Sequence, residues 1–187
     1  MKLKLIKRLT MFSIMLALLV VSPVVAQEAA PETEKSKKEQ KKEALAANLE
    51  TIKKAAQDSM FIIEANTLRG KNTFSQFVSS NTNFIKLNGN EVIIQTANPF
   101  MIGYNGLGGV TITGEVSQYK LTEDEDGVRI LLQMTSAILG HSTLNISVSA
   151  SGNSNAIVRT GYGGYLQLNG DMKLLQESGY YEGMSIL

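Results

Sequence analysis

From Met60 onward, apolar and polar residues alternate with a period of two, and this alternation requires a fold built from half-buried β-strands. The clearest run covers residues 143–150, where Leu144, Ile146 and Val148 alternate with polar side chains. About eight such strands are predicted, at residues 60–65, 84–87, 92–96, 110–117, 128–134, 143–150, 156–159 and 165–169.

Short turns separate these predicted strands, for example at residues 88–90, 125–127 and 151–153. Such connections cannot hold crossover helices, so neighbouring strands are expected to pair antiparallel. We therefore predict a mainly β fold, arranged as a sandwich or a barrel, with a lipocalin-like barrel as the alternative. Residues 68–81 fit no strand pattern, and we interpret them as a packed loop or a single turn.

Residues 1–26 have the pattern of a secretory signal peptide. Residues 1–8 carry four positive charges and no acid, and residues 9–21 are apolar except for Thr10 and Ser13. Small residues precede a predicted cleavage point after Ala26. The apolar run would span roughly 20 Å as a helix, which is short of the ~30 Å core of a bilayer. We expect the mature chain to be periplasmic or secreted, without insertion into the membrane.

Composition excludes several kinds of site and partner. The chain has no cysteine, which excludes a lipoprotein anchor, disulfides and thiolate metal sites. Its formal net charge of +1 includes the four cations of the predicted signal peptide, so removing them leaves −3. From residue 59 onward the cations are scattered singly, and nucleic acid is therefore not expected as a partner.

Residues 27–58 differ in composition from the β-rich part at residues 59–187, and we predict a separate segment. They contain seven acids and seven lysines, with neither an aromatic residue nor a glycine. A linker is expected at residues 29–33, followed by a helix whose narrow apolar stripe comprises Leu45, Leu49, Ile52 and Ala56. Because the stripe is thin, we interpret this helix as a solvated spacer, with docking on the β-domain or on a partner as the alternative.

Three motifs invite a chemical interpretation, and each is better explained structurally. The glycine-rich residues 103–109 lead into a strand and lack the Lys-Ser/Thr pair of a phosphate loop, so a wide hairpin or bulge is expected. The acidic residues 123–126 lack the ligand spacing of an EF-hand and fit a solvated turn. His141 is the only histidine and has no nearby acid. We therefore predict no catalytic, metal or cofactor site, and no enzyme.

The remaining candidates are tyrosines in glycine-rich stretches and at strand ends, which either close the ends of a β-core or line the mouth of a pocket. We predict an exported, non-enzymatic binding or structural module, whose partner is an unidentified protein or small molecule. The alternative is a lipocalin-like carrier of a small apolar ligand. The residues expected at the mouth of such a pocket are Met101, Ile102, Tyr104, Tyr162 and Tyr165.

Six segments together resemble a known family. They are Phe61-Ile-Ile-Glu-Ala65, Asn83-Phe-Ile-Lys-Leu-Asn-Gly89, Gly108-Gly-Val-Thr-Ile-Thr-Gly114, Leu144-Asn-Ile-Ser-Val148, Ala156-Ile-Val158 and Tyr165-Leu-Gln-Leu-Asn-Gly170. Their order and spacing resemble the Bacteroidota family named domain of unknown function 4251, over about residues 60–172. The resemblance implies a small exported β-protein of a Gram-negative envelope. It implies no activity and no functional residues.

Export predicts a defined N-terminus. When the chain is expressed in a Gram-negative host, N-terminal sequencing of the exported protein should begin at Gln27, because signal peptidase cleaves after Ala26. An exported product that retains Met1 would contradict the prediction that residues 1–26 are a cleaved signal peptide.

Overall fold

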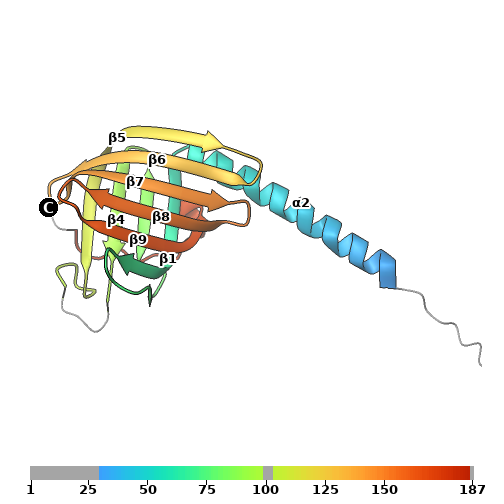
Figure 1. Cartoon of the computed structure of the whole chain (residues 1–187), viewed down its shortest axis with the longest axis horizontal. Coiled ribbons are helices and arrows are strands. Elements are labelled where there is room, and N and C mark those ends of the chain that lie inside the picture. Colours follow the sequence, from blue (N-terminus) through green and yellow to red (C-terminus); the bar gives the residue numbers. More distant parts are fainter. Residues whose placement is uncertain (1–29, 99–102, 186–187) are drawn as a thin grey trace, which may run out of the picture. The chain divides into compact units, whose positions relative to one another are not determined.

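The structure is a computed structural model that describes residues 30–98 and 103–185 (Figure 1). The described residues from Gln40 onward form one compact unit. A single long helix comes first, followed by strands and one short 3-10 turn. The elements are α2 (Ala30–Gln57), β1 (Met60–Gly70), β2 (Gln76–Phe77), β3 (Phe84–Asn88), β4 (Glu91–Thr96), β5 (Val110–Glu123), β6 (Gly127–Ser136), β7 (Gly140–Ser149), β8 (Asn153–Thr160), β9 (Tyr165–Lys173) and η1 (Leu175–Glu177).

Pairing of the first long strand with the last closes the sheet into an antiparallel barrel. The strand order is β1-β3-β4-β5-β6-β7-β8-β9, and β9 pairs again with β1 from Ile62 to Gly70. The short strand β2 is an extra, paired with β1 at Thr67 and Leu68. The prediction of an antiparallel sandwich or barrel is therefore confirmed, in its barrel form.

All eight predicted strands are present, and the part of the chain that the structure describes contains one more, β2, which was not predicted. Residues 68–70 continue β1, and Gln76–Phe77 form β2, where a packed loop or a turn was expected. The side chains of Phe74 and Phe77 are each 93% exposed, so the expectation of packing is wrong for them. Backbone pairing with β1 holds this segment in place, without burial of its side chains.

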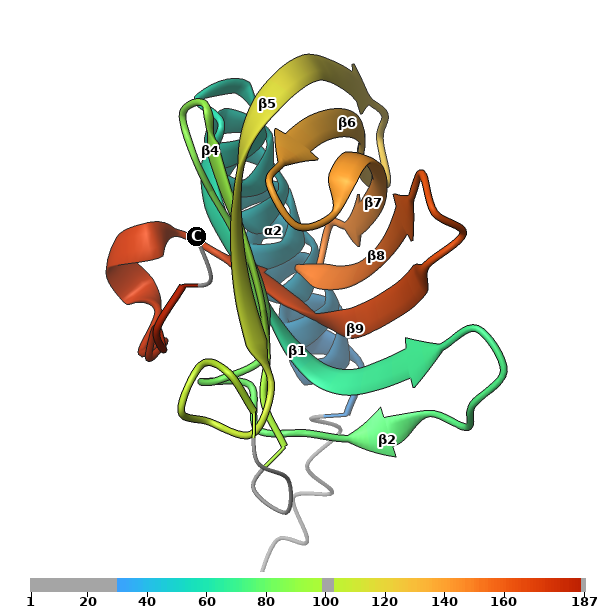
Figure 2. The same ribbon diagram turned by 90° about the vertical axis from the view of Figure 1, so that its left-hand side faces the viewer.

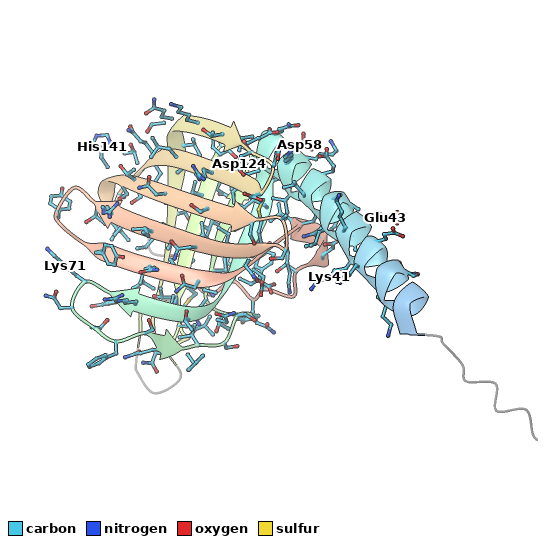
Figure 3. The ribbon with its side chains drawn as sticks, turned by 45° about the vertical axis from the view of Figure 1, so that its right-hand side comes forward. Lys41, Glu43, Asp58, Lys71, Asp124 and His141 are labelled. Carbon is cyan, nitrogen blue, oxygen red and sulfur yellow. The ribbon has the colours of Figure 1, made fainter. Side chains whose placement is uncertain are left out.

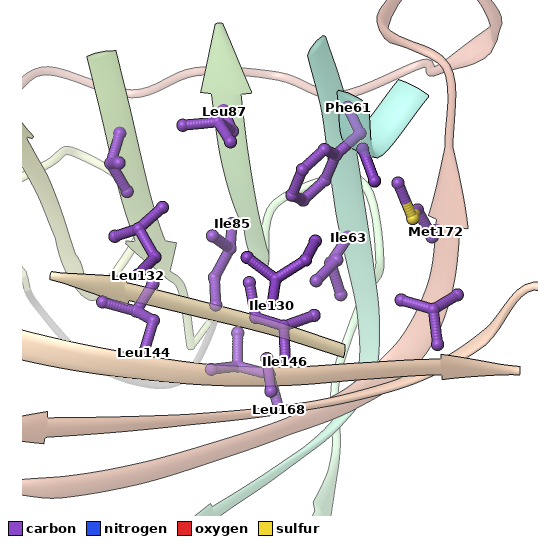
Figure 4. Close-up of a cluster of buried hydrophobic side chains, with 14 of the residues drawn as sticks. Phe61, Ile63, Ile85, Leu87, Ile130, Leu132, Leu144, Ile146, Leu168 and Met172 are labelled. Carbon is purple, nitrogen blue, oxygen red and sulfur yellow. The ribbon is translucent and has the colours of Figure 1, made fainter. Parts of the chain in front are cut away.

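The barrel interior is filled by apolar side chains that alternate inward along the strands (Figure 4). They form one continuous cluster in which most members are almost fully buried. From the strands, the cluster contains Phe61, Ile63, Ala65, Ile85, Leu87, Val92, Ile94, Val128, Ile130, Leu132, Met134, Leu144, Ile146, Val148, Ala156, Val158, Leu168 and Met172. This packing explains the period-two pattern from which the strands were predicted.

The last turns of α2 complete the core at one end of the barrel. Leu49, Ile52, Ala55 and Ala56 are buried there, and Ile52 is only 4% exposed. The helix is also tied to the barrel by hydrogen bonds: Tyr119 Oη donates to the Ala56 carbonyl at 2.7 Å, Asn48 Nδ2 to Ala150 O at 2.7 Å, and Gln57 Nε2 to Glu123 Oε1 at 2.7 Å. Burial raises the pKa of Tyr119 to about 12.

The interpretation of the helix as a solvated spacer is therefore wrong for its last turns, although residues 36–48 are exposed. Four apolar residues are enough for docking because they meet the apolar end of a barrel. The linker expected at residues 29–33 is also corrected, since the helix already begins at Ala30. Within the described ranges, no helix combines the length and the apolar character needed to cross a membrane.

The C-terminal segment lies against the outer face of the sheet. The ring of Tyr180 meets that of Phe84 edge to face, with centroids 5.2 Å apart. Lys86 Nζ lies 2.8 Å from Glu182 Oε2 and also donates to Tyr180 Oη. Burial lowers the pKa of Lys86, but its hydrogen bonds to Glu182 and Tyr180 outweigh burial and leave that pKa raised.

Docking of α2 can be tested by replacing two of its aliphatic side chains of equal size, one buried and one exposed, with alanine. Ile52→Ala should lower the free energy of unfolding by about 2–4 kcal/mol, because it opens a cavity between helix and barrel. Leu45→Ala, at a position that is 36% exposed, should change it by less than about 0.5 kcal/mol. Urea denaturation of both variants measures the difference, and equal effects would show that the helix does not dock.

Candidate functional site

The end of the barrel away from the last turns of α2 carries the connections that follow β1, β4, β6 and β8, because antiparallel strands alternate in direction. We call this end the mouth. Figure 2 views the barrel from the mouth, with the last turns of α2 behind the strands. The candidate site lies here because the opposite end is covered by the helix.

A hollow of about 640 Å³ lies at the mouth, between β2 and the connection from β4 to β5. We call it the mouth hollow. Its lining comprises Leu68, Gln76, Phe77, Val78, Ser79, Thr82, Asn83, Thr96, Ala97, Asn98, Gly108 and Gly109. Leu68 also packs against the barrel core, so the floor of the hollow is the outermost layer of that core.

The mouth hollow exists because β1 changes partner along its length. Its first residues, Met60 to Glu64, pair with β3, and after a register shift Thr67 and Leu68 pair with β2 on the same edge. The chain from β2 to β3 must then cross this edge as a loop. A space remains between that loop and the β4–β5 connection, where a continuous strand would otherwise have filled the wall.

Four buried polar side chains fix the two loops that border the hollow. Gln95, Asn83, Asn105 and Thr111 are each at most 2% exposed. Asn83 Nδ2 donates to Ser79 O at 2.9 Å, and Asn83 Oδ1 accepts from Ala97 N at 2.8 Å. The β2–β3 loop is thereby joined to the end of β4.

Asn105 fixes the β4–β5 connection to the end of β4 in the same way. Its Nδ2 donates to Thr96 O at 2.9 Å, and its Oδ1 accepts from the backbone N–H groups of Leu107 and Gly109. Gly109 is required beside it, since a Cβ there would lie 2.0 Å from Thr96 O. The glycine-rich residues 103–109 are thus a hairpin connection, as predicted, because β4 and β5 pair antiparallel on either side.

The side-chain amides of Gln95, Asn83 and Asn105 are hydrogen-bonded within the protein, so they fix the shape of the hollow, and the other lining side chains are the ones open to a ligand. That lining presents Leu68, Phe77, Val78 and Ala97 together with small hydroxyl and amide side chains. It contains no Asp, Glu, His, Lys, Arg or Tyr among the described residues. The arrangement suits contact with an apolar group and offers no ionisable side chain for acid–base work.

The tyrosines predicted from the sequence lie at the mouth but not in the hollow. Tyr104 belongs to the β4–β5 connection and is 80% exposed, and Tyr162 belongs to the β8–β9 turn and is 86% exposed. Tyr165 is half-buried, and its hydroxyl donates to Gln167 Oε1 at 3.1 Å. Met101 and Ile102 lie outside the described residues.

Sequence reasoning missed the residues that line the hollow, above all Phe77, Val78, Asn83 and Ala97. A signal was present in Phe77 and Val78, two apolar residues in a segment with no assigned strand. Asn83 and Ala97 carry no such signal, because a single amide and a single alanine at strand ends are common.

The other candidate groups make structural contacts. Asp124 Oδ2 lies 3.3 Å from Arg129 Nη2 in the acidic turn, and the exposed His141 Nδ1 lies 3.0 Å from Thr135 Oγ1. Among the described residues, no group of three or more His, Cys, Asp or Glu side chains is placed to hold a metal ion.

The family model for Domain of unknown function (DUF4251) matches residues 40–172. Among solved structures, a DUF4251 family protein from Bacteroides eggerthii DSM 20697 is similar, with 26% identity and a TM-score of 0.57. The match covers 71% of this chain and 91% of that one. No curated protein matches. The family match starts inside α2, which agrees with the last turns of that helix belonging to the barrel unit.

The polar scaffold of the mouth predicts a large effect for one residue. Gln95 Nε2 donates to Thr82 O and Tyr181 O, and its Oε1 accepts from Thr111 Oγ1 and Gly183 N. Gln95→Ala should lower the free energy of unfolding by about 2–4 kcal/mol, because these buried groups lose their partners. Urea denaturation measures this loss.

The matched control is Gln118→Ala, at an exposed position on β5, which should change stability by less than about 0.5 kcal/mol. A Gln95 variant as stable as this control would show that the network does not hold the loops.

Proposed function

This chain belongs to the DUF4251 family, and we propose that it is an exported, non-enzymatic binding module that holds a small, mostly apolar ligand in the mouth hollow. The observation that carries the proposal is the hollow itself: a preformed space with apolar lining, held open by a buried polar scaffold.

Size and lining support a small ligand. A volume of about 640 Å³ falls within the ~300–1,000 Å³ that is typical of ligand pockets in proteins. Apolar side chains on two sides, Phe77 and Val78 on one and Ala97 on the other, favour a ligand with an apolar body. Hydroxyl groups at Ser79 and Thr82 suit one or two polar atoms on that ligand.

The absence of ionisable side chains from the described lining supports binding instead of catalysis. General acid–base catalysis needs a titratable group within hydrogen-bonding reach of the substrate. The nearest charged side chains in sequence, Arg69 and Lys71, are both exposed and do not belong to the lining. A chemical step on a ligand in the hollow would lack a proton donor or acceptor from the lining.

Carriage of a ligand inside the barrel, as in a lipocalin, is less well supported. Such a carrier needs an internal cavity, whereas the interior holds one continuous cluster of buried side chains. Ile130, Leu144 and Ile146 are each at most 2% exposed at the centre of that cluster (Figure 4). The ligand is therefore assigned to the mouth, above the core.

A location outside the cytoplasm is part of the same proposal. It is supported by the signal-peptide pattern of residues 1–26. In an aqueous periplasm, a preformed apolar hollow would shield a poorly soluble ligand from water.

The proposal predicts uptake of an apolar fluorescent probe. N-phenyl-1-naphthylamine, which brightens when it leaves water, should bind the processed protein at one saturable site. Val78→Arg should weaken this binding about tenfold or more, because a charged side chain then occupies the apolar space. Fluorescence titration measures the dissociation constant.

Ile138→Arg provides the control, because Ile138 is 38% exposed in the β6–β7 turn at the mouth but does not line the hollow. This variant should bind the probe like the unmodified protein, and thermal melting should confirm that both variants fold. No saturable binding by the unmodified protein, or equal loss in both variants, would overturn the proposal.

A further inference from the structure

Two connections at the mouth lie side by side because β1 and β9 are paired along their length. Gly70 at the end of β1 is opposite Leu166 near the start of β9. The β1–β2 connection and the β8–β9 turn therefore leave the barrel as neighbours, and Figure 2 shows both on its right-hand side. We call residues 66–77 and 157–168, which include these connections, the docking tip.

The docking tip exposes large aromatic side chains to solvent. Phe74 and Phe77 are each 93% exposed, and Tyr162 is 86% exposed. Phe74 lies in the β1–β2 connection and Phe77 at the end of β2, and two phenylalanines this exposed within four residues form an apolar patch on the surface. Aromatic side chains at the tips of adjacent turns are well placed to enter another phase or another surface.

Charge on the docking tip has one sign. Residues 66–77 and 157–168 contain three cations, Arg69, Lys71 and Arg159, and no Asp or Glu. The opposite end of the barrel carries Asp58 and the acidic turn at residues 123–126, where Asp58 pairs with Lys54 and Asp124 with Arg129. Figure 3 shows Lys71 at one end of the barrel and Asp58 and Asp124 toward the other.

We infer that the docking tip binds the surface of an anionic phospholipid membrane. Phe74, Phe77 and Tyr162 enter the boundary between headgroups and acyl chains, and the three cations contact the lipid phosphates. The chain without residues 1–26 has a net charge of −3, so an anionic surface repels the molecule as a whole. Attraction is confined to the tip, which selects the orientation in which the mouth faces the membrane.

This contact is peripheral. Only side chains of the docking tip reach the headgroup region, while the rest of the barrel and its filled core remain in water. The sequence predicts no membrane insertion of the mature chain, and surface docking adds a contact that hydropathy along the chain does not reveal. Phe77 also borders the mouth hollow, but docking does not require that the hollow be occupied.

The chain has no tryptophan, so a single introduced tryptophan reports its own surroundings. In the processed protein with Phe77→Trp, vesicles of phosphatidylcholine with about one third phosphatidylglycerol should shift the emission maximum to shorter wavelength, because the indole leaves water. The same change at Met60→Trp gives the control, since Met60 is 48% exposed beside the helix end of the barrel. That variant should show no shift.

The charge requirement is tested in the same assay. Adding Arg69→Glu and Lys71→Glu to the Phe77→Trp protein should raise the lipid concentration needed for half of the shift about tenfold or more, because attraction becomes repulsion. Thermal melting before vesicle addition verifies that each variant is folded.

No shift at position 77, or an equal shift at position 60, would overturn the inference. A shift at position 77 that depends on protein concentration without vesicles would also overturn it, because the tip would then bind a second copy of the chain. Probe binding in the mouth hollow is measured separately and without lipid, so failure of docking and failure of the proposed function are distinguishable.

Discussion

Pairing of β1 with β9 closes the sheet, and both the filled core and the two different ends of the molecule depend on it. Closure removes the free edges that an open sheet of eight strands would expose to aggregation. It also encloses the inward-facing side chains in one cluster, which a chain without a single disulfide needs for stability. The closed barrel has two ends, which differ in how they are covered and in their charge.

One end is sealed and acidic, and the other is open and weakly basic. The last turns of α2 supply Ile52 and Ala56 to the core and cover the first end, beside the carboxylates of residues 123–126. At the other end β1 changes partner, β2 lies on its edge, and the mouth hollow remains between loops. The proposed ligand site and the proposed lipid contact both lie at the mouth, because the apolar lining of the hollow and the exposed aromatic side chains are in contact with solvent there.

The sequence predicted the strands well because inward and outward positions alternate, as at Leu144, Ile146 and Val148. It did not choose between sandwich and barrel, since alternation does not encode which strands pair across the sheet. Strand β2 was missed because its pairing uses backbone groups while Phe77 stays exposed. Helix docking was missed because Ile52 and its few apolar neighbours are buried only through the shape of the barrel end. The tyrosines were predicted at the mouth because turn residues surround them. The hollow was not predicted, because it depends on a change of pairing partner along β1 that no pattern of residue types indicates.

The central claim is that ligand binds at the mouth, above a filled core. Methyl NMR during titration with N-phenyl-1-naphthylamine tests it directly, because methyl groups report from both places. We expect shifts confined to Leu68, Val78 and Ala97 at the hollow. Shifts at Ile130, Leu144 and Ile146 instead, with none at the hollow, would show that the ligand enters the barrel interior and would contradict the account.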